Sequence, residues 1–383
     1  MSERQEPLVS VLTPVYNGEE FLAECIESVL AQTYSNWEYI IINNCSTDRT
    51  LEIALDYAKK DSRILVRSND GFVGVIENHN IAFTLLSSRA KYCKVVSADD
   101  FIFPDCLAKI VDFAEANPSA GIIGSYQLSG DLIKWQGFQY PRAVFSGLEI
   151  CRHFFLLPQV FVEGKPIFGF GTPTSLLYRA DLVRESKGKF YPNSSPHADT
   201  SACFEVLRNS SFGFVYHVLS YERTHATTQS SKSKELNRYL SAFLNDLQQY
   251  GPFYLTKEEL EREIDKQLAA YHQFLGINYL IGFRKKEFWS YHKSRLEELG
   301  HPLKRLVLLR AGLAAILKEA LNPEQAVRKL RKQFFLASTD VPVHAAPQRR
   351  TNLETVPRTS KASEPIDISS SPERSSGSPP NRR

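Results

Sequence analysis

Residues 8–48 read LVSVLTPVYNGEEFLAECIESVLAQTYSNWEYIIINNCSTD. The stretch opens with a short apolar run, 8–13, and closes on a second one, 37–42, each of a length typical of a buried strand. Between them lie apolar residues at the spacing of a helix with one buried face: Phe21, Leu22, Cys25, Ile26, Val29 and Leu30. Asn17, three residues before Glu20, is suited to cap that helix. Strand, helix and strand in this order predict a βαβ unit.

The same alternation continues to about residue 127. The further elements expected are a helix after Ser46-Thr47-Asp48, a strand at 63–67, a helix at 75–86, a strand at 92–96, a helix at 106–116 and a strand at 121–126. These strands are apolar along their length, as expected when helices cover both faces of a sheet. The fold class is therefore α/β, with a mostly parallel sheet flanked by helices.

Three regions of the chain differ in pattern. The α/β domain, placed at 1–231, ends in a less regular stretch that mixes aromatic residues, Gly and Pro, with a helix predicted near 202–207. Residues 232–337 carry long helical patterns and no clear strands, which predicts a helical C-terminal region. Residues 338–383 are rich in Pro, Ser, Arg and Thr. Such a segment buries too little apolar surface to offset its ordering entropy, so a disordered tail is predicted.

Composition is typical of a cytoplasmic globular protein. The chain has 383 residues, a hydrophobic fraction of 43% and a net charge of +3, which permits a sizeable core and gives no indication of nucleic-acid binding. None of its six cysteines forms a CxxC pair, and most lie in apolar runs, which favours buried thiols in a reducing compartment. No secretory signal is visible, and no apolar run reaches the roughly 18 residues of a transmembrane helix.

Polar segments follow the first four predicted strands: Thr13–Asn17, Asn43–Asp48, Ser68–Gly71 and Ser97–Asp100. Ligands of open α/β sheets bind beyond the carboxyl ends of the strands. Loops are polar in any case, but Asp99-Asp100 needs a further explanation, because adjacent carboxylates repel each other unless a cation lies nearby. A divalent ion bridged to substrate phosphates is a common arrangement. These loops contain no GxGxxG or GxxxxGK[ST] pattern, which argues against a dinucleotide site and a P-loop.

Four segments, taken in register, resemble the motifs of family 2 inverting glycosyltransferases of the GT-A fold. They are Val9–Gly18 (VSVLTPVYNG), Ser28–Tyr34 (SVLAQTY), Asn44–Asp48 (NCSTD) and Ser97–Asp100 (SADD). Their order and spacing match the family over roughly residues 8–231. The resemblance implies transfer of a hexosyl or related sugar from a nucleoside diphosphate donor to an acceptor hydroxyl.

The resemblance also implies where the nucleotide binds, with UDP as the first expectation. Pro14 and Tyr16 belong to the loop that packs on the base. Asn44 stands where the family usually has an aspartate that accepts from the uracil ring N–H. Asparagine keeps an acceptor oxygen but adds donors and removes the charge, so the base is left open. The residues implied in nucleotide binding are Pro14, Val15, Tyr16, Asn17, Asn44, Ser46, Asn69, Ser97, Ala98 and Asp99.

The acidic pair matches the family's metal-binding motif. By the resemblance, Asp100 is a ligand of Mn²⁺ or Mg²⁺, and Asp99 holds the ribose or orients the metal shell. The first acid of the usual motif is replaced by Ser97 or Ala98. His225 resembles a late histidine of the family that helps to hold the metal or the diphosphate; the alternative is a structural histidine.

Inverting transfer needs a carboxylate that takes the proton of the attacking hydroxyl. In Pro196-His197-Ala198-Asp199-Thr200, only Asp199 of the family's usual acidic pair remains, so the resemblance makes Asp199 the base, with a helix N-cap as the alternative. Arg223 is expected to contact phosphate oxygens or to form a surface salt bridge. Gly171 and Thr172 resemble the turn that lines the acceptor side.

Residues 284–332 combine many Lys and Arg with apolar and aromatic residues. A basic amphipathic helix of this kind can lie on an anionic membrane surface. Packing on the catalytic domain or on a second subunit is the simpler alternative, so peripheral contact with the inner membrane face and a homo-oligomer both remain open. The expected acceptor is a saccharide or a lipid-linked sugar, in polysaccharide or glycoconjugate synthesis.

Two other functions are compatible with an α/β fold of this kind. An inactive protein that only binds a sugar nucleotide would not need Asp99, Asp100 and Asp199 together, and all three are present. A nucleotidyltransferase would carry a glycine-rich basic loop after the first strand, and Thr13–Gly18 is not such a loop. The sequence therefore favours a glycosyltransferase.

Overall fold

The structure is a computed structural model, and it describes residues 6–138, 140–157, 161–162, 165–166, 169–193, 195, 197–224, 236–282 and 284–321. The strands are β1 (Val9–Val15), β2 (Trp37–Asn43), β3 (Ile64–Ser68), β4 (Tyr92–Val95), β5 (Phe101–Ile102), β6 (Ala120–Ser129), β7 (Leu132–Lys134), β8 (Val144–Ser146), β9 (Phe161–Val162), β10 (Lys165–Pro166), β11 (Leu176–Arg179) and β12 (Ser211–Tyr221). The helices of the α/β part are α1 (Leu22–Leu30), α2 (Thr50–Ala58), α3 (Val75–Thr84), α4 (Cys106–Ala116), α5 (Gly147–Leu156), the 3₁₀ turn η1 (Pro173–Ser175), α6 (Ala180–Glu185) and α7 (Ala198–Leu207). They are followed by α9 (Tyr239–Tyr254), α10 (Lys257–Ile281), α11 (Lys286–Glu298) and α12 (Arg305–Ala320).

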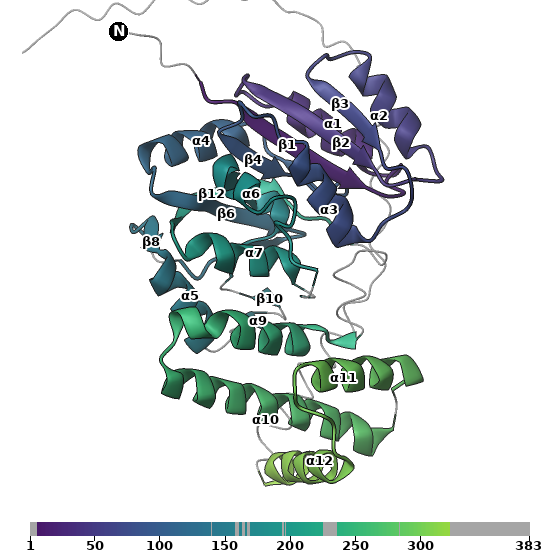
Figure 1. Cartoon of the computed structure of the whole chain (residues 1–383), viewed down its shortest axis with the longest axis vertical. Coiled ribbons are helices and arrows are strands. Elements are labelled where there is room, and N and C mark those ends of the chain that lie inside the picture. The colour runs from purple at the N-terminus through teal and green to yellow at the C-terminus, as the bar shows by residue number, and fades with distance from the viewer. Residues whose placement is uncertain are drawn as a thin grey trace, which may run out of the picture. The chain divides into compact units, whose positions relative to one another are not determined.

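One large sheet organises the α/β part, with the strand order β3-β2-β1-β4-β11-β6-β12-β5 (Figure 1). The first four strands are parallel, and their register places Val15 of β1 opposite Asn43 of β2. Strand β11 runs antiparallel between β4 and β6, and β12 runs parallel to β6. The predicted α/β class and the parallel arrangement of β1 to β4 are confirmed. The rest of the sheet contains both parallel and antiparallel pairs, because β11 runs antiparallel to both of its neighbours.

Helices cover both faces of the sheet. Along β1, Val11 faces one layer of the core and Leu12 the other, as the period of two in a strand requires. The first layer is filled mainly from α1 and α4, for example by Ile26 and Leu107, and the second from α3 and α7, for example by Phe83 and Phe204. The central strands β1, β2 and β4 are therefore buried on both faces, which explains why they are largely apolar, whereas the edge strand β3 is exposed at Leu65 and Arg67.

Helix α9 belongs to this core although it lies beyond the predicted domain boundary. Its Leu247 and Tyr250 share a cluster with Phe204 of α7, while Leu244 joins a separate cluster with Tyr271 and other residues of α10 to α12. The helical C-terminal region is thus continuous with the α/β part through α9. The predicted tail, 338–383, lies outside the described residues.

Asn17 does not cap α1, because its side chain contacts Thr47 and the helix begins at Leu22 without a side-chain cap. All six cysteines are free thiols. None of the helices in the described part of the chain combines the length and the apolar composition that a bilayer crossing requires.

Candidate functional site

The four parallel strands β1 to β4 end at the same edge of the sheet (Figure 1). Tyr16 and Asn17 follow β1, Asn44 follows β2, Asn69 follows β3, and the acidic pair follows β4. This edge therefore collects most of the residues expected to bind a nucleotide, from four segments far apart in the sequence.

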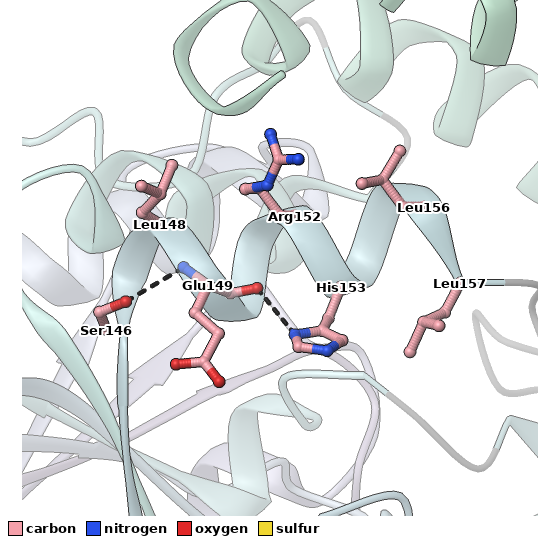
Figure 2. A pocket seen from close by; sticks show the side chains of 7 residues that line it. All are labelled: Ser146, Leu148, Glu149, Arg152, His153, Leu156 and Leu157. Carbon is pink, nitrogen blue, oxygen red and sulfur yellow. Dashed lines mark hydrogen bonds between the residues drawn. The ribbon is translucent and has the colours of Figure 1, made fainter. Parts of the chain in front are cut away.

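Two hollows of the described surface lie elsewhere. The first, of about 440 Å³, lies along α5 (Figure 2); its lining residues are Ser146, Leu148, Glu149, Arg152, His153, Leu156 and Leu157. The second, of about 450 Å³, includes Tyr92, the first residue of β4, and Glu115 near the end of α4. Neither is lined by a residue that follows the carboxyl end of a parallel strand, so the candidate site rests on the strand-end residues themselves.

Asn44 anchors the loop that follows β3. Its Oδ1 accepts hydrogen bonds from the Val73 amide, at 3.0 Å, and from Asn69 Nδ2, at 2.9 Å, while its Nδ2 donates to the Val73 carbonyl at 2.8 Å. Asn44 is buried, and its oxygen already serves two donors. A base N–H that bonds to this oxygen would have to displace one of them.

A second set of bonds ties the loop after β1 to the loop after β2. The Asn17 amide donates to Ser46 Oγ at 3.0 Å, and Asn17 Oδ1 accepts from the Thr47 amide at 2.8 Å. Asn17 has a φ of 51°, a left-handed conformation that asparagine tolerates better than most residues. Together with Asn44, these bonds hold three strand-end loops in one arrangement.

Two exposed aromatic rings lie at the surface of this arrangement. Tyr16 and Phe72 are 48% and 64% exposed, and their ring centroids are 4.8 Å apart at an interplanar angle of 64°. Phe72 lies in the loop anchored by Asn44, between Asn69 and Val73. The sequence pattern pointed to Tyr16 but not to Phe72, whose only signal was an aromatic residue in a polar strand-end loop.

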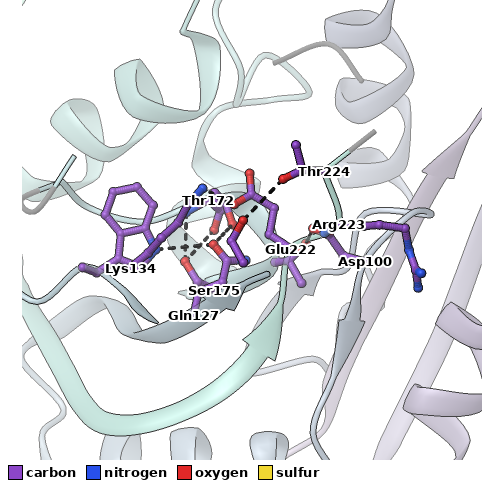
Figure 3. Close-up of polar contacts among 11 residues, drawn as sticks. Asp100, Gln127, Lys134, Thr172, Ser175, Glu222, Arg223 and Thr224 are labelled. Carbon is purple, nitrogen blue, oxygen red and sulfur yellow. Dashed lines mark hydrogen bonds and ion pairs between the residues drawn. The ribbon is translucent and has the colours of Figure 1, made fainter. Parts of the chain in front are cut away.

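Asp100 is buried beside Asp99 at the end of β4. Its Oδ2 accepts a hydrogen bond from Thr174 Oγ1 at 2.7 Å. Its Oδ1 accepts from the Arg223 amide at 3.0 Å (Figure 3). Burial, together with the charge of Asp99, raises the pKa of Asp100 to about 7. The pair therefore holds negative charge that is poorly solvated, and a cation at this position would stabilise it.

Thr174, in η1, organises this corner and was not foreseen. Besides Asp100, its Oγ1 lies 3.1 Å from Ser97 Oγ and accepts from the Ser97 amide at 3.1 Å. The buried Lys94 of β4 donates to the Thr174 carbonyl and, at 3.0 Å, to the Leu176 carbonyl, and burial lowers the pKa of its ammonium group. Lys94 thus holds η1 against the end of β4.

Arg223 lies against the acidic pair through its main chain and its side chain. Its Nε donates to the Asp99 carbonyl at 2.9 Å, its Nη2 contacts Glu24 at 2.5 Å, and its guanidinium lies 4.4 Å from the Phe21 ring centre. The salt bridge expected as the alternative is therefore present. His225 lies outside the described residues.

Thr172 adjoins the same corner (Figure 3), and Gly171 directly precedes it. Thr172 Oγ1 donates to Oε1 of the buried Gln127 at 3.0 Å. Gly171 has a φ of 139°, and a Cβ there would lie 2.4 Å from Ser175 Oγ, so only glycine fits. The turn is therefore positioned next to Thr174, the partner of Asp100.

Asp199 lies in the first turn of α7. His197 occupies the N-cap position, so Asp199 does not cap the helix. Burial lowers the pKa of His79, on α3, and the charge of Asp199 acts in the opposite direction. Helix α7 packs against α5, α9 and β6, and among the described residues no hydrogen bond joins Asp199 to Asp100.

A metal at the acidic pair would have two protein carboxylates. The described residues contain no group of three or more His, Cys, Asp or Glu side chains placed to hold an ion. Mg²⁺ is commonly bound by one or two carboxylates together with substrate phosphates and water. The carboxylates of Asp99 and Asp100 fit a metal ion of that kind, whose remaining ligands would be phosphate oxygens of a nucleotide and water.

The sequence profile of glycosyl transferase family 2 matches residues 10–185. The chain contains a family 2 glycosyltransferase domain. An uncharacterised glycosyltransferase of Haemophilus influenzae is 41% identical over 120 residues, which are 31% of this chain and 36% of that protein. One of Rickettsia typhi is 28% identical over 285 residues, 74% of this chain and 81% of that protein.

Solved structures with a similar fold include Staphylococcus aureus TarS. Its residues 1–349, solved in complex with UDP-GlcNAc, align with a TM-score of 0.55 at 16% identity, over 80% of this chain and 88% of that one. The GT-A fold expected from the motifs is thus confirmed. The chain spans only about a third of the H. influenzae and Bacillus subtilis relatives that it matches, at 36% of each.

Proposed function

We propose that this chain is a metal-dependent, inverting glycosyltransferase that uses a nucleoside diphosphate sugar, with UDP as the favoured nucleotide. One observation carries the proposal: an acidic pair, Asp99-Asp100, follows the parallel strand β4 inside a family 2 domain, and both carboxylate oxygens of the buried Asp100 accept hydrogen bonds, from Thr174 and from the Arg223 amide. Two adjacent acids held in this way favour a divalent cation and, through it, a diphosphate.

In the proposed reaction, an acceptor hydroxyl attacks the anomeric carbon of the donor sugar. The new C–O bond forms as the bond to the diphosphate breaks, and the nucleoside diphosphate leaves with the bonding electrons. Asp199 takes the proton that the hydroxyl loses. Because attack and departure occur on opposite faces of one carbon, the configuration inverts.

The chain's own residues hold the donor. Tyr16 and Phe72 offer ring faces to the base, and Asn44 fixes the loop that carries Phe72. Mn²⁺ or Mg²⁺ at Asp99 and Asp100 would offset charge on the departing diphosphate. Gly171 and Thr172 line the acceptor side.

The proposed setting is polysaccharide or glycoconjugate synthesis in the cytoplasm. The acceptor is a saccharide or a lipid-linked sugar, and the protein makes peripheral contact with the inner membrane face. The named relatives support the transferase class, and TarS, solved with UDP-GlcNAc, supports a UDP-sugar donor.

A donor panel tests the proposal. The full chain is incubated with UDP-, GDP- and dTDP-sugars, with Mg²⁺, Mn²⁺ or EDTA, and nucleotide release is measured alongside calorimetric binding of each nucleoside diphosphate. We expect metal-dependent binding and release with UDP-sugars, and loss of binding in Asp100→Ala but not in Asp105→Ala, a partly exposed acid at the start of α4. Binding of no nucleoside diphosphate under any metal condition overturns the proposal. Binding without turnover identifies a sugar-nucleotide-binding protein instead.

A further inference from the structure

Helix α12 has two apolar faces, and only one of them packs on α10, the helix beside it in Figure 1. On the inner face Gly312 meets Gly276 of α10 so closely that a Cβ on Gly276 would lie 2.6 Å from the Gly312 nitrogen. Leu308 and Ala315, one turn to either side of Gly312, are buried. This spacing of one residue per turn fixes the side of α12 that faces α10.

The opposite face carries a second apolar stripe. Leu306, Leu313, Leu317 and Leu321 are 58%, 52%, 61% and 85% exposed. Their helical spacing places them along one side, over a length of about 22 Å. A surface helix of a globular protein normally has a single apolar stripe, which faces the core. The second stripe is therefore not explained by folding, and a contiguous exposed apolar surface is typical of an interaction site.

Positive charge surrounds this stripe. Lys304, Arg305, Arg310 and Lys318 belong to α12 or directly precede it, and the sequence contains no Asp or Glu between Glu298 and Glu319. Within the described part of the chain, no carboxylate lies in ion-pair distance of any of the four. Arg310 lies within the stripe, between Leu306 and Leu313.

We propose that this face of α12 binds an anionic lipid surface. Leucines enter the boundary between headgroups and acyl chains, and flanking cations meet anionic headgroups. Arg310 can keep its guanidinium at headgroup level while its methylene stem lies among the leucines. The inference sharpens the peripheral membrane contact of the proposed function, but it does not depend on the donor or on turnover.

Two other occupants fit the charges less well. In a two-fold symmetric dimer formed through this face, the four cations of one copy would lie close to the same four cations of the other and would repel them. The chain that follows α12 carries Arg328, Lys329, Arg331 and Lys332, which repeat the charge of α12 and do not complement it. An anionic membrane complements both the stripe and the cations.

Vesicle co-sedimentation of the full chain tests the proposal. The vesicles are phosphatidylcholine alone or equal parts of phosphatidylcholine and phosphatidylglycerol. We expect binding to the mixed vesicles that falls with salt, and at least a roughly tenfold weaker association for the double variant Leu313→Glu/Leu317→Glu, which loses apolar insertion and adds repulsion. The matched control is Leu55→Glu, at an exposed leucine of α2.

A second variant keeps the test independent of folding. Arg310→Gln/Lys318→Gln leaves the apolar stripe intact, and it should weaken binding to the mixed vesicles while circular dichroism and thermal midpoint stay at their native values. Unchanged sedimentation of both double variants overturns the proposal, as does equal binding to neutral vesicles. Dimers in light scattering that dissociate in the leucine variant also overturn it, because they identify a second copy as the occupant. Loss of nucleotide binding in the donor panel leaves this result unaffected.

Discussion

The carboxylate of Asp246, on α9, accepts a 2.8 Å hydrogen bond from the hydroxyl of Ser201, on α7, two residues after Asp199. The same Oδ1 lies 3.3 Å from Ser195 Oγ, which in turn accepts from the amide of His197, the N-cap residue of α7. One buried acid of the C-terminal helices thus fixes both sides of the helix start that carries the proposed base.

We expect Asp246→Ala to slow transfer through misplacement of Asp199. A carboxylate displaced by about 1 Å can lower turnover by roughly 10- to 100-fold, whereas donor binding is made elsewhere and the donor KM should stay within about twofold. Asp246→Asn keeps an acceptor oxygen for Ser201 and should retain most of the activity. Steady-state kinetics check this, with the exposed Asp265→Ala of α10 as control. A native kcat in Asp246→Ala contradicts the positioning role.

Asp246 also predicts a pH dependence of stability. Burial raises its pKa from 3.8 to about 7, against the opposing hydrogen bonds from Ser201 and Ser195. A raised carboxyl pKa means that the folded state binds the proton more tightly. The contribution of Asp246 to the free energy of unfolding is therefore greatest below about pH 4. It decreases as the pH rises to about 7, by roughly 4 kcal/mol at most.

Asn at position 246 mimics the protonated acid and does not titrate. Relative to wild type, Asp246→Asn should therefore gain stability between about pH 4 and pH 7 and level off above that range, as measured by urea unfolding at each pH. A stability difference that is constant over this range would show that Asp246 has an ordinary pKa in the folded protein.

Asp199→Asn should abolish most turnover and leave donor binding intact. The amide cannot take the proton of the acceptor hydroxyl, and loss of a general base typically costs roughly 10²- to 10⁴-fold in rate. Nucleotide release and calorimetric binding of the nucleoside diphosphate are measured on the same preparation, with Asp56→Asn on α2 as control. Turnover at the native rate would remove Asp199 from the chemistry.

The elements of the fold were most predictable where local signals were strong. The helix predicted at 106–116 has the same bounds in the structure, because Asn117-Pro118 ends it. The long strand β12 was not predicted, since its pairing with β6 shifts register between Val215 and Val218 and breaks the alternation of its side chains. The position and antiparallel direction of β11 depend on its pairing with β4 and β6, and the local sequence of β11 gives no information about those partners.

The residues of the candidate site were likewise predictable only where the local sequence carried a signal. Asp99 and Asp100 were found because two adjacent acids after an apolar strand are unusual in themselves. Thr174 reaches Asp100 from 74 residues away through η1, and nothing in its local sequence indicates that contact. Phe72 was missed because an aromatic residue is most often part of the core, whereas this one is exposed. The roles of Asp199, Arg223 and Asn44 stay predictions.

The anchor at Asn44 can be tested through stability. Asn44→Ala removes three hydrogen bonds to Asn69 and Val73 and leaves these partly buried partners unsatisfied, so we expect a loss of about 1–3 kcal/mol in the free energy of unfolding. Urea denaturation measures it. The control Asn36→Ala removes a hydrogen bond to Glu6 at the surface and should cost less. Equal effects of the two substitutions would show that the loop does not depend on Asn44.

Phe72→Ala should weaken nucleotide binding without destabilising the protein. Stacking of a base on an aromatic ring is worth about 1–3 kcal/mol, so we expect a roughly 5- to 150-fold higher Kd for UDP. Phe72→Trp should restore or strengthen binding, since it offers a larger ring. Phe253→Ala, at an exposed phenylalanine of α9, is the control. Calorimetry with UDP and with ribose 5-phosphate separates the base from the sugar and phosphate: only UDP should respond to Phe72. If both ligands lose affinity equally, Phe72 acts by shaping the loop and does not contact the base.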